Sequence, residues 1–283
     1  MYDLLFVRKR RRRKVAALVA LFSSIGVTSL VIISFLGRSV GTFTVSLNNS
    51  EVNLALCEKK DSNKNSTFLR VNPNNKYIEH SFDFFRDSLA TLDNEDTPYN
   101  VGENEYTYYD PTEEKIKTGI VLEYFKYTFY VKNIGSKTAS YNMKISIDDR
   151  TRSDDDTGRG LDDTLRVMVF ENKPNSDEHN YHVYAKKAAE NNYDINGNPT
   201  DRELIVSHDG NDHETEEYPL AENFKDGKTV AEYNVTNFIK HDMLRYTIVV
   251  WLEGGDPQSK PDEDYPEGAT LKLGVDIAAH ENA

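Results

Sequence analysis

The chain of 283 residues contains a single cysteine, Cys57, so no disulfide bond can form within it. Small secreted domains often depend on disulfides, whereas a region of about 245 residues buries a sizeable apolar core without them. The chain also lacks a phosphate-binding loop, a dinucleotide fingerprint and a His-Glu-x-x-His zinc helix. The sequence therefore gives no positive indication of an enzyme, and we expect Cys57, at a predicted strand end, to belong to the core.

One uncharged apolar run stands out, from Val15 to Leu36. An α-helix rises about 1.5 Å per residue, so roughly 20 apolar residues cross a hydrocarbon layer of about 30 Å. The basic cluster from Arg8 to Lys14 precedes this run and places residues 1–14 in the cytosol by the positive-inside rule. The sequence thus predicts a single-pass cell-membrane protein that contacts the lipid bilayer through residues 15–36, with the bulk of the chain extracellular.

A cleaved secretory signal is the alternative to a retained anchor. The apolar cores of cleaved signals usually span about 7–15 residues and end at a small-x-small site. Here the run is longer, and the nearest small-x-small triplet, Gly37 to Ser39, has a charged residue in its middle. We therefore favour a retained signal-anchor, and the mature N-terminus on cells would distinguish the two.

Charge is divided unevenly along the chain. The formal net charge is −13, and residues 1–38 carry eight lysines and arginines against one acid, Asp3. The first 38 residues thus carry +7, which leaves −20 for the rest. So acidic an outer region argues against nucleic acid as a partner and suits cations or basic ligands.

Alternating apolar and polar residues dominate the region after the apolar run. Side chains of a strand point alternately to its two faces, so this period predicts half-buried strands. The predicted strands cover 43–47, 52–56, 119–132, 141–147, 164–170, 230–235, 244–252 and 271–277. The first two are predicted to pair as a hairpin. In 119–132 the core face is predicted to hold Phe125, Tyr127 and Phe129, with Lys126 and Thr128 on the other face.

These patterns predict a mainly β fold. Seven or more strands with polar turns favour an antiparallel β-sandwich, Ig-like or jelly-roll, over residues 40–283, and a closed barrel is the competing architecture. Insertions interrupt the pattern at about 72–118 and 172–228. Short helices are predicted within them, over 80–93 and 184–190. Insertions of this length often carry binding surfaces.

The most specific local pattern is a calcium-loop-like stretch. An EF-hand loop places oxygen ligands at positions 1, 3, 5, 7, 9 and 12, with glycine at position 6. Counted along this stretch, those ligand positions are Asn192, Asp194, Asn196, Asn198, Thr200 and Glu203. Gly197 occupies position 6, but an asparagine at position 1 removes a charge and Pro199 replaces a branched residue. Weak Ca²⁺ binding is therefore one hypothesis and a plain surface turn the other, and no cofactor is required.

Histidines and aspartates suggest metal sites less specifically. His179 and His182 are three residues apart, and His208 and His213 are five apart. Zinc catalysis needs three protein ligands and a base beside an open position, so we expect these to be ordinary exposed histidines. Aspartates over 148–163 alternate with arginines, which favours solvated loop charge over a cation site.

Trp251 lies on the opposite parity from the core residues of its predicted strand. Beside Glu253 and Asp256 it could line a sugar-binding face. More often such a tryptophan packs under a loop or covers the second face of a sheet. The sequence leaves both interpretations open and favours the second.

Two parts of the chain resemble a known group of proteins. The stretch from Tyr127 to Tyr141 resembles the strand, K-N-x-G-S turn and strand of biofilm-fibre and camelysin-type surface proteins of Gram-positive bacteria, as does Gly41 to Val45 after an export segment. The stretch from Val249 to Pro257 is similar to Trp-x-Glu-Gly-x-Asp-Pro endings of related surface proteins. The resemblance implies an exported Ig-like or jelly-roll domain that assembles at the cell surface. Some members are called metallopeptidases, but no ligand set carries over to this chain.

The sequence therefore predicts a membrane-anchored bacterial surface protein with a structural, adhesion or matrix-assembly role and no catalytic residues. Other surface proteins or glycans are the expected partners, besides the bilayer. A ligand- or calcium-binding surface module and a camelysin-type metallopeptidase are the alternatives.

Overall fold

A computed structural model describes residues 43–49, 53–71, 76–77, 89–93, 103–110, 115–122, 124–152, 160–174, 176, 178–190, 192–207, 213–253, 256 and 270–281. The predicted span of residues 15–36 lies outside these ranges. Within them, no helix is both long and apolar enough to cross a membrane. The described chain is mainly β, as the alternating pattern predicts.

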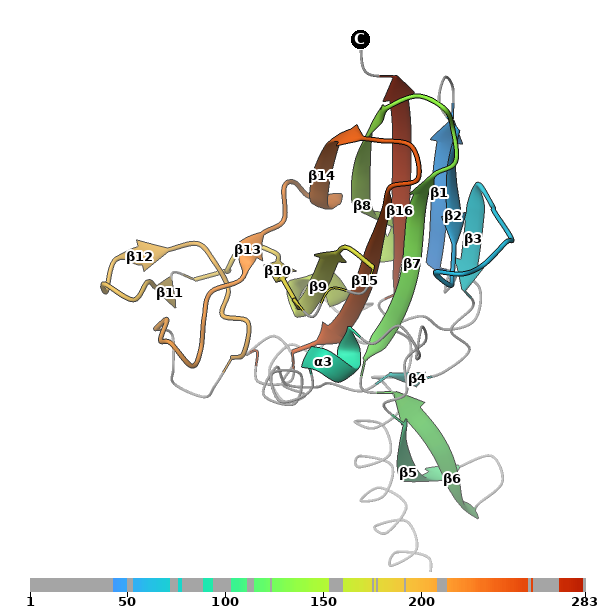
Figure 1. Cartoon of the computed structure of the whole chain (residues 1–283). Helices are drawn as coiled ribbons and strands as arrows, with labels where there is room; N and C mark the ends of the chain where they lie inside the picture. The colour runs from blue at the N-terminus through green and yellow to red at the C-terminus, as the bar shows by residue number, and fades with distance from the viewer. Residues whose placement is uncertain are drawn as a thin grey trace, which may run out of the picture.

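Five strands form the first sheet, in the order β14-β8-β16-β1-β3 (Figure 1). Their bounds are Phe43–Asn49 for β1, Phe68–Val71 for β3, Ala139–Thr151 for β8, Thr229–Phe238 for β14 and Thr270–Glu281 for β16. β1 pairs with β16 in parallel, and the other pairs of this sheet are antiparallel. The predicted antiparallel pairing therefore holds for the other pairs of this sheet but not for β1 with β16, because most of the chain separates these two strands and no tight turn fixes their direction.

Six strands form the second sheet, in the order β13-β10-β9-β15-β7-β2. Their bounds are Leu54–Cys57 for β2, Phe125–Asn133 for β7, Leu165–Asn172 for β9, Tyr181–Ala185 for β10, Glu222–Asn223 for β13 and Met243–Leu252 for β15. The predicted hairpin of the first two strands is wrong, since β2 pairs with β7 and β1 belongs to the other sheet. All four β2 residues are buried, which a two-stranded surface hairpin would not provide.

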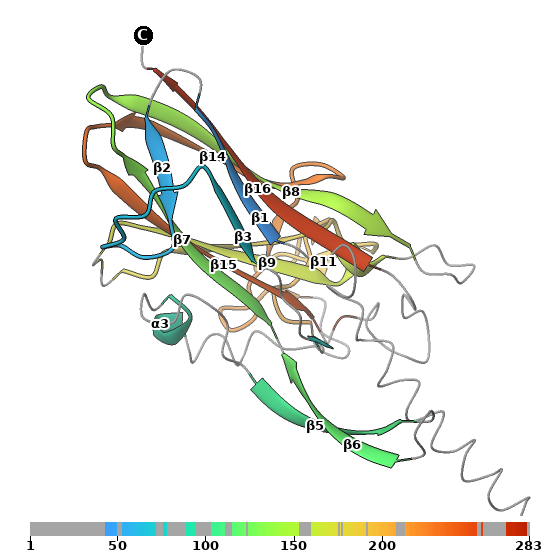
Figure 2. The same ribbon diagram turned by 90° about the vertical axis from the view of Figure 1, so that its right-hand side faces the viewer.

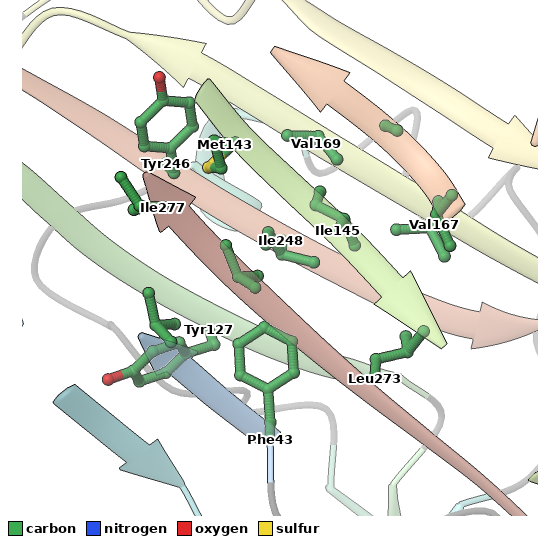
Figure 3. Packing of buried hydrophobic residues seen from close by; sticks show 14 of the residues in the cluster. Phe43, Tyr127, Met143, Ile145, Val167, Val169, Tyr246, Ile248, Leu273 and Ile277 are labelled. Atoms are coloured by element: carbon green, nitrogen blue, oxygen red, sulfur yellow. The ribbon is translucent and has the colours of Figure 1, made fainter. Parts of the chain in front are cut away.

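The two sheets face each other and share one hydrophobic core (Figures 1 and 2). The ring of Phe43 in β1 lies 5.1 Å from that of Phe125 in β7. The hydroxyls of Tyr141 in β8 and Tyr246 in β15 hydrogen-bond across the layers at 2.8 Å. Figure 3 shows Met143, Ile145, Val167, Ile248 and Leu273 between the layers. The predicted core faces of these strands are therefore confirmed.

Smaller elements surround the two sheets. They are β4 at Lys76–Tyr77, α3 at Leu89–Leu92, β5 at Glu103–Asp110, β6 at Lys115–Leu122, the 3₁₀-helix η2 at Leu161–Asp163, β11 at Asn192–Tyr193 and β12 at Pro199–Thr200. β4, β6 and β5 form a three-stranded sheet, whose hairpin projects from the body in Figures 1 and 2. The single strand predicted over 119–132 is thus divided between β6 and β7.

The two helix predictions have different outcomes. α3 lies within the predicted range 80–93, of which residues 80–88 are outside the described ranges. The helix predicted over 184–190 is wrong, because β10 occupies 181–185 and pairs with β9. Local helix propensity there is outweighed by the ladder to a buried neighbouring strand. The 172–228 stretch thereby contributes β10 and β13 to the six-stranded sheet.

Candidate functional site

The outer face of the six-stranded sheet, which points away from the five-stranded sheet, is buried. Its side chains alternate with the core residues of β7, β9, β10 and β15. Lys126 is 1% exposed and Thr128 is 0% exposed, so the expectation of a solvent-facing side in this strand is wrong. A second apolar cluster covers this face, and it includes Leu92 of α3 together with Ile205 and Val206. In Figure 2, α3 lies on the side of β7 and β15 opposite to β16.

On β9 and β15, arginines lie at the two ends of this outer face, while Lys126 of β7 lies opposite Val249 between them. Across β9 and β15, Arg166 is opposite Trp251 at one end, and Asn172 is opposite Arg245 at the other. The two intervening cross-strand pairs are Met168 with Val249 and Phe170 with Thr247. The two charged ends are therefore about 20 Å apart along β9.

Asp93, the residue after α3, binds four side chains at the Asn172 end. Its carboxylate accepts hydrogen bonds from Arg245 Nη2 at 2.6 Å, Asn172 Nδ2 at 2.9 Å and Thr247 Oγ1 at 3.2 Å, and it contacts His179 Nδ1 at 3.0 Å. We call these five residues the Asp93 cluster. Asp93 and Arg245 are 2% and 3% exposed, so this ion pair is removed from water. The cluster attaches the α3 segment to β9 and β15.

Arg166 organises the opposite end. It is fully buried, and its guanidinium donates to Asp256 Oδ2 at 3.0 Å, to the Leu204 carbonyl at 3.0 Å and to Ser207 Oγ at 3.5 Å. Glu203 Oε2 lies 4.0 Å from the same guanidinium. We call these residues the Arg166 cluster. It attaches the 203–207 segment to the sheet, as the Asp93 cluster attaches α3.

The Trp-Leu-Glu-Gly-Gly-Asp-Pro stretch contributes to this same end. Trp251 is 1% exposed, and its indole Nε1 donates to Glu253 Oε2 at 3.0 Å. Asp256 from the same stretch is the partner of Arg166. The tryptophan therefore packs beneath the cover of the sheet, and the sugar-binding alternative for Trp251 is wrong.

Burial shifts the pKa of two groups on or beside this face. Burial lowers the pKa of Lys126 to about 8, opposed by nearby Asp93 and reinforced by Arg245. Burial raises the pKa of Glu203 to about 7, opposed by Arg166 and reinforced by Asp256. Such shifts are typical of functional sites but also of structural ion-pair networks. Lys126 is on β7 and Glu203 belongs to the cover over β9, so they lie in separate parts of the face.

The chemistry of the Asp93 cluster depends on what its carboxylate already binds. An aspartate that holds the Nδ1 of a histidine is one part of a hydrolytic triad. Here the charge of Asp93 is also paired with Arg245, and the side chain of His179 is 31% exposed. Among the described residues, His179 has no second hydrogen-bond partner that could serve as a nucleophile. The described contacts of Asp93 link α3 to β9 and β15.

The six predicted calcium ligands fall into separate groups, five of them on the β11–β12 hairpin. Hydrogen bonds from the side-chain Nδ2 of Asn198, at 3.1 and 3.2 Å, and from the backbone N–H of Asn198 at 2.8 Å and of Asn196 at 2.9 Å lower the pKa of Asp194. Glu203 instead lies beyond the hairpin, with Asn192 Nδ2 3.4 Å away. Thr200 pairs with Asn192 in the ladder. Gly197 has a φ of 78°, as the turn requires.

The predicted histidine pairs do not converge in the structure. His179 contacts Asp93, whereas His182 Nδ1 contacts Glu222 Oε1 at 2.6 Å. His213 stacks on Tyr193 with ring centroids 4.6 Å apart, and His208 lies outside the described residues. In the part of the chain that is described, no group of three or more histidine, cysteine, aspartate or glutamate side chains is arranged to hold a metal ion.

Part of the acidic stretch is an ion-pair network instead of solvated charge. Asp162 is 1% exposed and pairs with Arg150 at 2.7 Å, Arg152 at 3.1 Å and Lys186 at 3.2 Å. Its burial contradicts the expectation for this residue, because it is surrounded by Arg150 of β8, by Arg152 just after β8 and by Lys186 just after β10. Residues 154–156 lie outside the described ranges.

Cys57 lies in β2 and is 2% exposed, so its assignment to the core is confirmed. Burial raises the pKa of its thiol above the ordinary value, which keeps it protonated near neutral pH.

Sequence reasoning missed Asp93, Arg166 and Arg245 as the organising residues of this face. Arg166 stands between Leu165 and Val167, and Arg245 precedes Tyr246, in strands that read as half-buried. One sequence feature could have indicated that this face is buried. Each arginine stands on the second face of a long central strand, and the chain has large insertions that are able to cover that face.

Comparison with known proteins gives no relative: no family model and no curated protein matches this chain. The resemblance to Gram-positive surface proteins therefore remains a prediction.

Proposed function

We propose that the chain is a bacterial cell-surface module that is held by residues 15–36 in the membrane and works through contact, in adhesion, matrix assembly or envelope structure. Its outer region is an Ig-like or jelly-roll β-sandwich. Its partners are other surface proteins or glycans, and its acidic exterior does not bind nucleic acid.

The position of the charged residues of the six-stranded sheet is the observation that carries this proposal. Arg166 and Arg245 are buried. Arg245 binds the carboxylate of Asp93, the residue after α3, and Arg166 binds Asp256, which follows β15, together with the Leu204 carbonyl and the Ser207 hydroxyl of the covering 203–207 segment. Their interactions hold the cover on the sheet. Because both faces of the six-stranded sheet are packed, the strand edges and the loops are the parts that can contact other surface proteins or glycans.

Exposed apolar side chains supply candidate contact points on that body. Among the described residues, the large ones are Phe68, Ile134, Ile195 and Ile239. Ile195, 59% exposed, lies at the tip of the β11–β12 hairpin, where the hydrogen bonds of Asp194 fix the turn. Single apolar side chains are common on surfaces, so their value here is as sites for mutation.

The first experiment tests topology on intact cells. An epitope tag after Ala283 should bind antibody without permeabilisation, and a tag before Met1 should bind only after it. The second compares cell adhesion or matrix formation between wild type and Ile195→Asp, with Asp61→Ala, an exposed change on another loop, as the matched control. An inaccessible C-terminal tag would contradict the proposed location.

A camelysin-type metallopeptidase is the enzymatic alternative. It would draw its ligands from histidines within 179–213. The purified full-length chain in detergent, assayed on labelled peptides and glycans, separates the two. Hydrolysis that is lost on chelation and restored by zinc would replace the contact role with catalysis, whereas turnover no faster than that of a boiled sample agrees with our proposal.

A further inference from the structure

The sequence contains the acceptor signal for asparagine-linked glycans. This signal is Asn-x-Ser/Thr, where x is not proline, and it is used at surface positions of exported chains. Asn48, Asn65 and Asn234 each begin such a triplet, whereas the triplet at Asn198 has Pro199 in its middle. Triplets of this kind also arise by chance, so their placement in the fold decides whether a glycan fits.

The triplet at Asn234 presents its amide and its hydroxyl to solvent from β14. Asn234 and Thr236 are exposed, whereas Tyr233 and Val235 pack against the core. Alternate residues of a strand share a face, so both exposed side chains are accessible from one side. The ladder to β8 shifts register between Val235 and Phe238, so Thr236 lies outside the regular pairing. Among the described residues, none forms a hydrogen bond with the side-chain amide of Asn234. An enzyme can therefore reach the whole acceptor group.

The triplet at Asn65 lies at the other end of the same sheet. It directly precedes β3, which ends the five-stranded sheet opposite to β14 (Figure 1). Asn65 and Thr67 are exposed, and Ser66 between them forms an isolated bridge with Leu56. Within the described chain, the side-chain amide of Asn65 likewise has no hydrogen-bond partner. Both ends of this sheet thus carry an accessible acceptor.

The outer face of the five-stranded sheet has room for a glycan. One row of directly paired residues crosses four strands, from Asn234 through Asn142 and Ala278 to Asn48. All four are exposed, in contrast to the buried outer face of the six-stranded sheet. Asn48 begins the third triplet, but Ser50 lies outside the described residues, so the inference rests on the other two triplets.

Both end strands of this sheet would be protected by a bulky hydrophilic neighbour. An end strand offers backbone groups to other chains, and proteins commonly protect such strands with lysine or proline. The segment from Ala231 to Thr236 of β14 has neither. In β3, Phe68 is 51% exposed and directly follows the Asn65 triplet. A hydrated glycan beside each strand would block association with other chains at both ends of the sheet.

We propose that Asn65 and Asn234 each carry an N-linked glycan, and that the two glycans shield the end strands of the five-stranded sheet. The donor is an oligosaccharide linked to a lipid diphosphate, which a membrane transferase of the cell supplies. The amide nitrogen forms a C–N bond to the anomeric carbon as the C–O bond to the diphosphate breaks. The diphosphate keeps the bonding electron pair and the amide loses one proton, so the step needs no oxidant or reductant.

This inference rests on the proposed extracellular location and deepens the contact function. With the five-stranded sheet shielded, contact with other surface molecules is left to the opposite sheet's loops and to the β11–β12 hairpin that carries Ile195.

Peptide mass spectrometry of the full-length chain, purified from the membranes of the cells that make it, tests the proposal. Peptides that contain Asn65 and Asn234 should carry the added mass of sugar residues on the asparagine. The peptide that contains Asn198 should not, because Pro199 blocks its triplet, and it supplies an internal control in the same sample.

Two pairs of variants test whether the triplet itself directs the glycan. Thr236→Val keeps the branched shape but removes the hydroxyl, so the glycan at Asn234 should be lost, whereas Thr236→Ser should retain it. Thr67→Val and Thr67→Ser make the same comparison for Asn65. Each change affects an exposed side chain, and the glycan at the other site should be unchanged.

Unmodified asparagines at both positions would overturn the inference, as would a glycan on Asn234 that survives Thr236→Val. A glycan at one position alone would contradict the shielding of both end strands. An accessible C-terminal tag together with unmodified asparagines would reject the glycans and keep the proposed location, so the two can fail separately.

Discussion

Loss of the Asp93 carboxylate should destabilise the fold more than any exposed acidic substitution. Asp93 is the charge partner of Arg245, whose guanidinium lies 2.6 Å away and is 3% exposed. Asp93→Ala leaves that cation buried without this partner. Breaking one side of a buried ion pair costs about 3–5 kcal/mol of unfolding free energy. Asn172 and Thr247 lose an acceptor as well, which places the expected cost toward the upper part of this range.

Urea denaturation of the full-length chain in detergent measures this cost. Trp251 is the one tryptophan, it is 1% exposed, and it lies in the same strand as Arg245, so its fluorescence reports on the affected sheet. With an m-value of about 2–3 kcal/mol per molar, the midpoint should fall by roughly 1–2.5 M urea. Asp61→Ala, at an exposed aspartate, should change the unfolding free energy by no more than about 0.5 kcal/mol. Equal midpoints for Asp93→Ala and Asp61→Ala would refute the structural role of the cluster.

Three further predictions concern the covered face and the hairpin beside it. Lys126→Met should raise the urea midpoint at pH 7, because burial lowers the pKa of Lys126 in the folded chain to about 8 and so disfavours its charged amine there. The gain should shrink as the pH rises from about 8 through the ordinary lysine pKa of 10.5, above which the wild-type amine is neutral in both the folded and the unfolded state. The pKa of Glu203 is raised to about 7, so between about pH 4.5 and pH 7 the folded chain retains a proton that the unfolded chain has lost, and the unfolding free energy falls as the pH rises through this window. Glu203→Gln should lessen that fall. Identical profiles of unfolding free energy against pH for the wild type and this variant would disprove the prediction. Millimolar Ca²⁺ should leave the thermal midpoint unchanged, because backbone N–H groups already bind Oδ1 of Asp194 and the side chain of Asn198 binds Oδ2. A rise of several degrees that Asp194→Asn abolishes would support the calcium-loop hypothesis instead.

The inner faces of the two sheets could be predicted because a period of two is a local property. Tyr127, Met143 and Ile248 each lie in a strand whose own residues alternate, so no knowledge of the partner strand is needed. The strand partners could not be predicted in the same way. The parallel pair of β1 and β16 joins residues from opposite ends of the chain, and no local pattern specifies it.

The outer face was misread because its cover comes from elsewhere in the sequence. Lys126 and Arg166 look like solvent positions in their own strands. Leu92 and Ile205, which belong to the cluster that buries this face, lie in the two stretches that break the strand pattern. Likewise the helix predicted over 184–190 overlaps the end of β10, where pairing with β9 outweighs local propensity. The candidate site could not be assembled without these long-range contacts.

Amine labelling of the native full-length chain tests most directly whether the charged face is a covered structural layer. Lys126 and Lys187 differ in exposure, since the first is 1% exposed and the side chain of the second is 66% exposed. A lysine with a pKa near 8 reacts fast if reagent reaches it, because more of it is the neutral amine. We predict that Lys126 is modified far more slowly than Lys187, as read by mass spectrometry. Modification of Lys126 before Lys187 would show an open and reactive site, and would contradict a protein that works by contact.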